Sequence, residues 1–393
     1  MSSPSPNDNT SSKATPTVDA TRRIFTSPED ESAHQHLLRR QLEKEATDLG
    51  FEKVGIASTD LRQDRERFRA WVADGLHADL DYLTRHGEKR FQPEVLVPGT
   101  VSIICVRLNY LFPGLDSVKT LNDRRKAYIS RYALGRDYHK VLRTKLQKLA
   151  TRLSERWGPF GYRVFTDSAP VLEKPLASQA GLGWMGKHTL ILDKSVGSWF
   201  FLGELFTDLP LPISSPVEPH CGKCRACLRV CPTQAIIEPY RLDAGRCISY
   251  LTIENKGPIA PELRPLLGNR IFGCDDCQLI CPWNRWAKTT TVADFTPRHG
   301  LDATDIVTLL YWDESDFLQR TAGNPLRRAG YGGWVRNLCV AAGNAPGDPA
   351  LLQALHQKKT ALSAHSADKT PAWLMEHLAD AIHKQESRLG TAE

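Results

Sequence analysis

The sequence contains no apolar run long enough to cross a membrane and no apolar segment close to its N-terminus. A membrane-spanning helix needs about 20 apolar residues in succession, and an export signal needs a shorter apolar stretch behind a basic N-terminus. We therefore expect a protein without a membrane anchor that works in the cytoplasm, where disulfide bonds rarely form.

A strong charge imbalance is also absent. The 393 residues include 51 Lys and Arg against 45 Asp and Glu, which gives a formal net charge of +6. Such a mildly basic chain can bind a polyanion such as nucleic acid, but its charge does not require one. The hydrophobic content of 41% allows a large core, and the length allows about two or three domains.

Cysteine, in contrast, is concentrated in one region. Of the 10 cysteines, all but Cys105 and Cys339 lie between residues 221 and 281. The first run reads Cys221-Gly-Lys-Cys224-Arg-Ala-Cys227-Leu-Arg-Val-Cys231-Pro232, the second reads Cys274-Asp-Asp-Cys277-Gln-Leu-Ile-Cys281-Pro282, and Cys247 lies between them. This spacing is typical of bacterial ferredoxins with two 4Fe-4S clusters, in which the last cysteine of each run binds the other cluster.

The spacing therefore divides the cysteines between two clusters. We expect one 4Fe-4S cluster to bind Cys221, Cys224, Cys227 and Cys281, and the second to bind Cys231, Cys247, Cys274 and Cys277. A zinc ribbon is the main alternative, but it usually has two separated C-x2-C pairs without a third cysteine. Disulfides are a weaker alternative in a reducing compartment. Two neighbouring clusters would conduct electrons to a nearby reaction site.

Helical and strand patterns alternate through the first half of the chain. Helices are expected near residues 37–49, 65–73, 138–157 and 168–180, and strands near 54–57, 101–106, 162–166, 189–192 and 199–205. This alternation favours an α/β domain, with Cys105 in its core. We expect a disordered polar tail over residues 1–33, the α/β domain over 34–215, a ferredoxin-like domain over 216–292 and a helical, HEAT-like region over 293–393.

Three further features have a structural and a functional interpretation. The glycines of Gly181-Leu-Gly-Trp-Met-Gly186 fit a dinucleotide fingerprint, but they follow a predicted helix and precede a strand, which is the wrong order for phosphate binding. We expect them to let the backbone approach another flat or bulky ligand. Asp167 lies at a strand-to-helix junction, where it can cap the helix or act in catalysis. His139 is expected on a helix face, because its surroundings lack the glycine of the cobalamin-binding D-x-H-x-x-G pattern.

Motifs spread over about residues 34–345 together resemble the epoxyqueuosine reductase family. They are Tyr132-Ala-Leu-Gly-Arg-Asp-Tyr-His139, Asp167-Ser-Ala-Pro-Val-Leu-Glu173, Gly181-Leu-Gly-Trp-Met-Gly-Lys-His188, the two cysteine runs, Cys247-Ile-Ser-Tyr-Leu-Thr-Ile-Glu254 and Arg336-Asn-Leu-Cys-Val-Ala-Ala-Gly-Asn344. The resemblance implies a cobalamin-dependent reductase, related to reductive dehalogenases. Such an enzyme removes the epoxide oxygen of epoxyqueuosine at the wobble position of tRNA and so completes queuosine biosynthesis.

The resemblance also implies roles for individual residues. Asp167 matches the family's proton donor, for which we expect burial to raise the pKa. The corrin pocket would include Arg90, Tyr132, Asp167, His188, Ile191 and Leu202, with Ser249 and Asp275 beside the cluster ligands. The implied partners are tRNA with a GUN anticodon and an external reductant such as flavodoxin or ferredoxin. We expect a monomer, because tRNA must reach the site.

Basic and aromatic residues near the cysteine runs are candidates for RNA contact, since RNA loops are bound by stacking and by phosphate contacts. They are Trp283, Arg285, Trp286, Lys288, Arg327, Arg328 and Arg336. The alternative is that the tryptophans belong to the core. The family pattern also ends near Asn344, which leaves the extent of the tRNA platform open.

Two other functions stay open from the sequence. The chain could be an electron-transfer subunit, although such a carrier would not need a large α/β domain. It could also dehalogenate a small organic halide, although that reaction would not need basic C-terminal helices. Bound corrinoid would argue against the first function, and tRNA binding would argue against the second.

Overall fold

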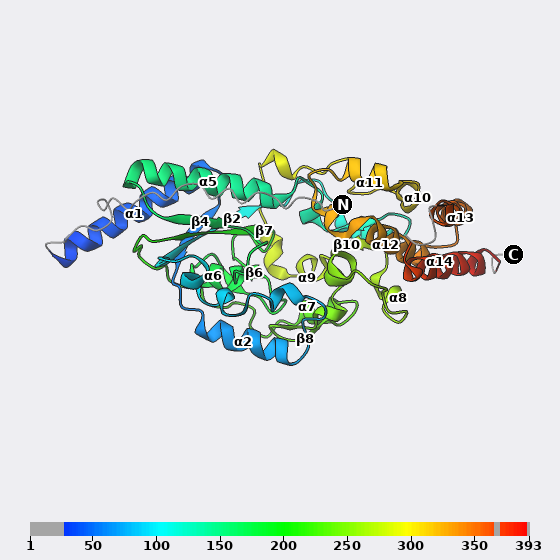
Figure 1. The fold of residues 1–393 in the computed structure, drawn as a ribbon, viewed down its shortest axis with the longest axis horizontal. Helices are drawn as coiled ribbons and strands as arrows, with labels where there is room; N and C mark the ends of the chain where they lie inside the picture. The colour runs from blue at the N-terminus through cyan, green and yellow to red at the C-terminus, as the bar shows by residue number, and fades with distance from the viewer. Residues whose placement is uncertain (1–26, 365–369, 391–393) are drawn as a thin grey trace, which may run out of the picture.

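The computed structural model describes residues 27–364 and 370–390. Its helices are α1 Pro28–Asp48, α2 Arg62–Ala73, α3 Pro93–Leu96, α4 Ser117–Asn122, α5 Tyr138–Trp157, α6 Glu173–Gln179, α7 Ala226–Val230, α8 Arg264–Leu267, α9 Asp276–Leu279, α10 Ile306–Leu310, α11 Glu314–Arg320, α12 Gly330–Asn344, α13 Pro349–Ala364 and α14 Ala372–Gly390. Its strands are β1 Lys53–Ala57, β2 Ser102–Asn109, β3 Tyr128–Ile129, β4 Tyr162–Phe165, β5 Trp184–Met185, β6 Ile191–Leu192, β7 Phe200–Thr207, β8 Ile236–Glu238, β9 Arg241–Leu242 and β10 Arg270–Phe272. The sheet lies at one end of the long axis and the C-terminal helices lie at the other (Figure 1).

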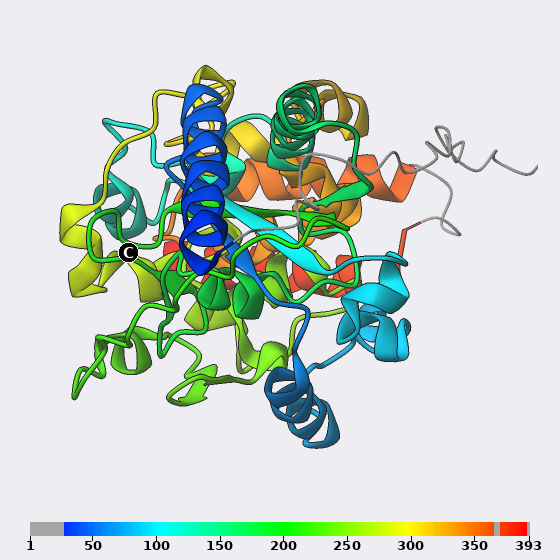
Figure 2. The same ribbon diagram turned by 90° about the vertical axis from the view of Figure 1, so that its left-hand side faces the viewer.

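The central sheet has the strand order β1-β2-β7-β4. Helices α1 and α5 cover one face and α6 lies on the other (Figure 1 and Figure 2). All residues of β2 are buried, because Val106 and Leu108 pack in the core with α1 and α5, whereas Ile103 and Cys105 pack with α6. Burial on both faces explains why this strand reads as a continuous apolar run.

The expected alternation of helices and strands is present, but every neighbouring pair in the sheet is antiparallel. A long connection that contains a helix permits either strand direction, so the alternation alone does not fix it. The pairing places Phe165 of β4 opposite Glu204 of β7. The chain segment that follows β4, which begins with Thr166 and Asp167, therefore starts beside the middle of β7.

The predicted tail is too long at its C-terminal end. Helix α1 begins at Pro28, because the Ser27 hydroxyl accepts a hydrogen bond from the backbone N–H of Asp30 at 3.2 Å and so caps the helix. Pro28 suits the first helical position, where no backbone N–H is needed. The rest of the predicted tail, residues 1–26, lies outside the described residues.

Helix α6 is shorter than the predicted helix over residues 168–180. It begins at Glu173, and the residues before it form an irregular segment. Asp167 has a positive φ of 55°, and Pro170 offers no backbone N–H for a helical hydrogen bond. Asp167 is therefore not a helix cap, and its conformation is one that a non-glycine residue adopts only where the surroundings enforce it.

The glycines of the 181–186 segment allow protein segments, rather than a ligand, to pack closely. A Cβ atom on Gly183 would lie 2.2 Å from the Leu192 carbonyl oxygen, and one on Gly186 would lie 2.7 Å from Cε1 of His188. The expectation that these glycines approach a flat ligand is therefore wrong at both positions. The expected order, a helix before the glycines and a strand near residues 189–192 after them, is confirmed by α6 and β6, although the short strand β5 also forms within the glycine segment.

The cysteine region contains the short helices α7 and α9, which contact each other, and the β8–β9 hairpin. It is joined to the preceding part of the chain by β10, which pairs in parallel with β3. Beyond it, α10 to α14 build a second core around Trp334, Leu338 and Leu378. Within the described ranges, the helices lack the combination of length and apolar character that a membrane span requires.

Arg336 lies inside this helical core, with 0% of its surface exposed. Its guanidinium donates hydrogen bonds to the backbone carbonyls of Leu251, Asn255 and Gly257 at 2.6, 2.9 and 2.6 Å. These carbonyls belong to the π-helix Tyr250–Glu254 and the loop after it. The expected RNA contact of Arg336 is therefore wrong, because the residue fastens the segment after Cys247 to α12.

We expect Arg336→Ala to lower the free energy of unfolding by about 3 kcal/mol or more, because one buried and two partly buried carbonyls would lose a charged donor. The urea midpoint, followed by circular dichroism, measures the loss. Arg285→Ala is the matched control, since Arg285 is exposed, and it should change the midpoint little. Equal midpoints for both variants would contradict the structural role of Arg336.

Candidate active site

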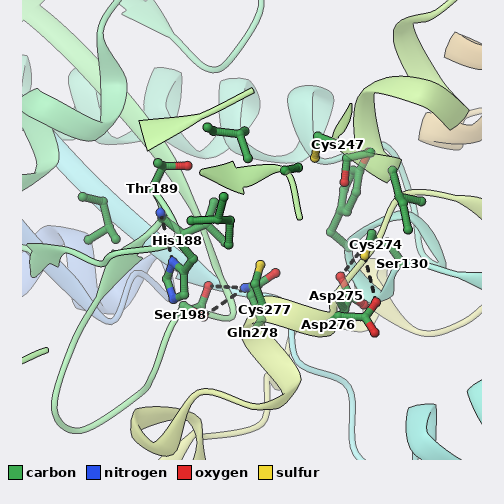
Figure 3. A pocket seen from close by; sticks show the side chains of 18 of the residues that line it. Ser130, His188, Thr189, Ser198, Cys247, Cys274, Asp275, Asp276, Cys277 and Gln278 are labelled. Carbon is green, nitrogen blue, oxygen red and sulfur yellow. Dashed lines mark hydrogen bonds between the residues drawn. The ribbon is translucent and has the colours of Figure 1, made fainter. Parts of the chain in front are cut away.

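Three adjoining cavities share Asp167 as a lining residue. The inner cavity, of about 400 Å³, lies between the start of β7 and the second cysteine run (Figure 3). The outer cavity, of about 410 Å³, is bordered by Tyr138 and Arg328. The side cavity, of about 570 Å³, lies against Arg90. Asp167 is thus placed where a molecule in the outer cavity would meet one in the inner cavity.

The cysteines form two groups around two cavities. Cys231, Cys247, Cys274 and Cys277 line the inner cavity, and the last three of them are labelled in Figure 3. Cys221, Cys224, Cys227 and Cys281 line a separate cavity of about 240 Å³, named here the Cys224 cavity. These are the two groups that the spacing predicts, including the exchange of the last cysteine of each run. His188 lines both cavities and so forms part of the wall between them.

The thiols surround these cavities without converging on one point. All cysteines of the described ranges are free thiols. Within those ranges, no group of three or more potential ligands is close enough to hold a single metal ion. A cubane cluster has its ligands at four separate corners, so this wider arrangement is compatible with a cluster in each cavity.

Most of the residues that the resemblance places at the corrin line the inner cavity. They are Tyr132, Asp167, His188, Ile191, Leu202, Ser249 and Asp275. Arg90 is the exception, because it lines the side cavity. Its guanidinium donates to the backbone carbonyls of Leu83 and Tyr82 at 3.0 and 3.1 Å. In this structure Arg90 holds the 82–90 loop.

His188 contributes a polar atom without a partner. Its Nδ1 accepts a hydrogen bond from the Leu190 backbone N–H at 3.2 Å, whereas its buried Nε2 has no partner among the described residues. Burial, reinforced by the charge of Lys174, lowers the pKa of His188 to about 4. The ring is therefore neutral at pH 7, with its proton on Nε2. A bound hydrogen-bond acceptor in one of the adjoining cavities would satisfy this donor.

Asp275 has both carboxylate oxygens occupied. They accept hydrogen bonds from the Tyr128 hydroxyl at 2.7 Å, the Ser130 hydroxyl at 2.5 Å and the Arg131 backbone N–H at 2.8 Å. Burial raises the pKa of Asp275, although these donors oppose the rise. Asp275 therefore ties the 128–131 segment to the cysteine run in which it lies.

Asp167 is held by two neighbours from the start of α5. The Tyr138 hydroxyl donates to its carboxylate, and Nε2 of His139 lies 3.2 Å from Oδ2. Burial raises the pKa of Asp167, but the hydrogen bonds from His139 and Tyr138 and the positive charge of His139 outweigh burial, so the net pKa is lowered. The expected rise in the pKa of Asp167 is therefore wrong, and the side chain is a carboxylate at pH 7.

His139 lies between two carboxylates. Its Nδ1 is 2.7 Å from Oδ1 of Asp137, and its Nε2 faces Asp167. Burial lowers the pKa of His139, but hydrogen bonds and charge from both aspartates exceed this effect and raise the pKa to about 9. The ring is thus an imidazolium at pH 7, and both nitrogens are engaged.

Two interacting carboxyl groups, of partly buried Glu173 and buried Glu204, lie next to the Asp167 segment. Glu173 accepts the backbone N–H of Asp167 and interacts electrostatically with Glu204. Glu204 is completely buried in β7, and both of its carboxylate oxygens lack a hydrogen-bond partner among the described residues. Burial, with the charge of Asp167 added, raises the pKa of Glu173 to about 8. Burial and the neighbouring Glu173 also raise the pKa of Glu204. Two adjacent carboxylates cannot both ionise in such surroundings, so the pair keeps a proton at neutral pH.

The residues expected to contact RNA border different cavities. Arg328 lines the outer cavity with Asp167, pairs with Glu254 and lies over the Tyr82 ring at 5.9 Å. Trp283 instead lines the Cys224 cavity and packs against Trp184. The remaining members divide in the same way: Arg327 borders the outer cavity, whereas exposed Arg285, Trp286 and Lys288 follow Trp283 in the sequence. Only the first group lies beside Asp167.

Sequence reasoning missed four residues of this site. The sequence predicts Tyr138 and His139 only as residues of the helix near 138–157, and it gives no reason to pair Glu173 with Glu204. A signal for Glu204 was present, because a single acid inside an apolar strand such as Phe-Phe-Leu-Gly-Glu-Leu-Phe-Thr is costly to bury without a role. The proximity of Tyr138 and His139 to Asp167 has no local sequence signal, since it depends on the packing of α5 against the sheet.

Comparisons with known proteins agree with this geometry. The family "Epoxyqueuosine reductase QueG, DUF1730" matches residues 90–168, and the "4Fe-4S double cluster binding domain" matches residues 220–284. The epoxyqueuosine reductase of Pseudomonas aeruginosa is 55% identical over 313 residues, which cover 79% of this chain and 87% of that protein. The Escherichia coli enzyme is 50% identical over 351 residues, which cover 89% and 90%.

Solved structures give the same result. An epoxyqueuosine reductase with an epoxyqueuosine-modified tRNA-Tyr stem loop matches with a TM-score of 0.72 at 25% identity, covering 90% of this chain and 100% of that chain. A Bacillus subtilis epoxyqueuosine reductase, described with its catalytic loop swung out of the active site, matches with a TM-score of 0.71 at 25% identity, covering 89% and 99%. The fold and site thus define an oxidoreductase with a double-cluster domain. The chain belongs to the epoxyqueuosine reductase family.

The raised pKa of His139 predicts a pH-dependent stability. The folded-state pKa of about 9 exceeds the ordinary value of 6.5. The charged ring therefore stabilises the folded protein fully below pH 6.5, and this contribution is lost as the pH rises through about 9. We expect the thermal midpoint of the wild type, relative to His139→Gln, to fall across this interval.

The control for this measurement is His383→Gln, which removes an exposed histidine of α14. Its midpoint should follow the wild type at every pH. A constant difference between the wild type and His139→Gln from pH 6.5 to 9 would show that the ring is not charged by its two aspartates.

Proposed function

We propose that this chain reduces epoxyqueuosine to queuosine at the wobble position of tRNA, the last step of queuosine biosynthesis. One observation carries the proposal: Asp167 separates an outer cavity bordered by arginines from an inner cavity bordered by four cysteines. Asp167, which can accept and donate a proton, thus adjoins both cavities. The outer one can admit a large anionic substrate, and the inner one is lined by cysteines that can bind an iron-sulfur cluster. Membership of the epoxyqueuosine reductase family supports the same reaction.

The stoichiometry of the reaction sets what the site must supply. Removal of the epoxide oxygen breaks both of its C–O bonds, forms a carbon–carbon double bond and releases the oxygen as water. The conversion therefore consumes two electrons and two protons. The chain must hold cofactors that provide the electrons, and its side chains must deliver protons to the departing oxygen.

We place cobalamin in the inner cavity. Ile191 and Leu202 offer apolar surface to a broad ring, and the unpartnered Nε2 of His188 offers a donor to a peripheral amide. Bound cobalamin would supply the two-electron reducing chemistry. Tyr132 and Ser249 complete the lining towards the outer cavity, because both residues border both cavities.

The two groups of cysteines would hold the 4Fe-4S clusters. The group around the inner cavity would place one cluster beside the cobalamin, and the group around the Cys224 cavity would place the other behind His188. Bound clusters supply electrons one at a time. Electrons would therefore enter at the Cys224 cavity and leave towards the inner cavity.

Asp167 and His139 would deliver protons as a unit. Asp167 is ionised, so it must first receive a proton before it can act as the acid. The imidazolium of His139 holds one at 3.2 Å from its Oδ2. His139 would pass this proton to Asp167, and Asp167 would donate it to the departing oxygen, while Tyr138 keeps the carboxylate oriented.

The partners follow from the same reaction. The substrate would be tRNA with a GUN anticodon, seated at the outer cavity with Arg327 and Arg328 against its backbone. The helices α12 to α14 would form a HEAT-like platform for the tRNA. An external reductant such as flavodoxin or ferredoxin would supply electrons. The protein would work as a monomer in the cytoplasm, where tRNA is modified.

The direct test is conversion of the modified base. Anaerobically prepared protein with bound cobalamin, reduced chemically, should convert epoxyqueuosine in tRNA to queuosine, as shown by mass analysis of the nucleosides. Bound clusters and cobalamin without conversion would contradict the proposed substrate.

We expect Asp167→Ala to retain iron, sulfide and cobalamin but to lower the rate of conversion by about 100-fold or more, because a positioned acid contributes at least that much. Metal analysis and single-turnover kinetics measure the two properties. Asp60→Ala, at an exposed aspartate outside the three cavities, is the control. Full activity of Asp167→Ala would remove this residue from the mechanism.

The grouping of the cysteines predicts separable losses of metal. Cys224→Ser should remove about half of the bound iron and sulfide while leaving the other cluster, and Cys247→Ser should remove the complementary half. Electron paramagnetic resonance of the reduced variants distinguishes the cluster that remains. Cys339→Ser, in the core of the C-terminal helices, should lose no iron. Loss of both spectra in either ligand variant would contradict the assignment to separate sites.

A further inference from the structure

The rim of the Cys224 cavity carries basic residues that the proposed reaction does not use. Lys223 and Arg225 flank Cys224 in the sequence, and Arg229 follows on α7. These three side chains are exposed, and within the described ranges none of them pairs with an acid. Glu218, which precedes Cys221, is the acidic residue nearest to this run in sequence. The rim therefore has an excess of positive charge.

Exposed apolar and aromatic side chains adjoin these charges. Ile280 precedes the ligand-forming Cys281, and Trp286 follows it with half of its surface exposed. Tyr240 is also exposed, and its backbone N–H donates to the Lys187 carbonyl at 3.0 Å. Lys187 in turn donates from Nζ to the carbonyls of Gly222 and Cys224 at 2.6 and 2.8 Å. Tyr240 is thereby tied to the loop that carries Cys224.

This rim is distinct from the opening beside Asp167. None of the residues that line the Cys224 cavity lines the outer or the side cavity. The Cys224 cavity shares His188 with the inner cavity. A tRNA at the outer cavity would therefore leave the rim accessible. The rim still lies close to the inner cavity, because the Cys224 cavity and the inner cavity share His188 in the wall between them.

We propose that the rim formed by Lys223, Arg225, Arg229, Tyr240, Ile280 and Trp286 is the docking surface for a small acidic electron-carrier protein of the flavodoxin type. The proposal rests on the proposed function, because it requires a cluster in the Cys224 cavity. Cys224 is the exposed cysteine of its group, so a carrier seated on the rim reaches that cluster over a short distance.

Charge and surface composition both suit this partner. Opposite charges accelerate the encounter of electron-transfer proteins and orient them. Small, transient interfaces combine such charges with a few exposed aromatic or aliphatic side chains. In the transfer step, the anionic flavin hydroquinone loses one electron and becomes the neutral semiquinone, while the oxidised cluster gains that electron. No bond forms and no proton moves.

The test uses holoenzyme and a purified flavodoxin in its hydroquinone form. Stopped-flow absorbance at low salt measures reduction of the clusters, and titration of oxidised flavodoxin measures binding. We expect Lys223→Glu combined with Arg225→Glu to slow the reduction by about 10-fold or more and to weaken its salt dependence. Reduction by dithionite, and conversion of epoxyqueuosine driven by dithionite, should stay within about twofold of the wild type.

A second pair, Arg229→Glu with Arg285→Glu, covers the case in which the first pair loses iron. Arg285 belongs to the same surface, because its guanidinium lies over the Trp286 ring at 4.9 Å. The control is Lys148→Glu with Arg163→Glu, which changes charge equally on α5 and β4, away from α7 (Figure 1), and should keep the wild-type rate. Unchanged reduction by flavodoxin in both rim variants would overturn the proposal. Loss of tRNA binding with unchanged flavodoxin reduction would overturn it too and assign the rim to RNA. If dithionite drives no conversion in the wild type, the proposed substrate is wrong, and the flavodoxin rates still test the rim.

Discussion

The interaction between the carboxyl groups of partly buried Glu173 and buried Glu204 is the one on which the candidate site depends. Glu204 lies in the middle of the central strand β7, and the antiparallel pairing with β4 brings the segment after Phe165 directly to it. The pair keeps a proton at neutral pH, and Glu173 then accepts the backbone N–H of Asp167. This contact helps to hold Asp167 at a positive φ that it would not adopt alone. The protonated Glu173–Glu204 pair thus helps to fix the Asp167 carboxylate between the cavities.

A second interaction of Asp167, with the positively charged ring of His139, favours the ionised form of its carboxyl group. The imidazolium of His139 lies between Asp137 and Asp167, and it keeps Asp167 ionised although burial favours the neutral acid. The site therefore holds protons on His139 and on the Glu173–Glu204 pair, and the ionised Asp167 interacts with both. The ionisable groups lie close enough to shift one another's pKa, so the loss of one member would change the protonation of the others.

Features that depend on local spacing could be predicted from the sequence, whereas those that depend on packing could not. The residues of α5 and the two groups of cysteines follow from a helical period and from ligand spacing, and the structure places both as expected. The strand directions, the partners of Asp167 and the burial of Arg336 have no such local cause. Arg336 illustrates the difficulty, because a single arginine within an apolar helix has the same sequence signature whether it contacts RNA or donates to backbone carbonyls of the protein.

The exchange of Cys231 and Cys281 between the two cysteine groups has a consequence for assembly. Neither set of thiols is contiguous, so the two runs must already lie together before either inorganic centre can be completed. Each centre would then act as a cross-link that closes the long loop between the runs, and metal binding would contribute to folding as well as to electron transfer. Oxidative loss of iron from one centre would remove one of these two cross-links and so lower the stability of the region, even where the other centre stays intact.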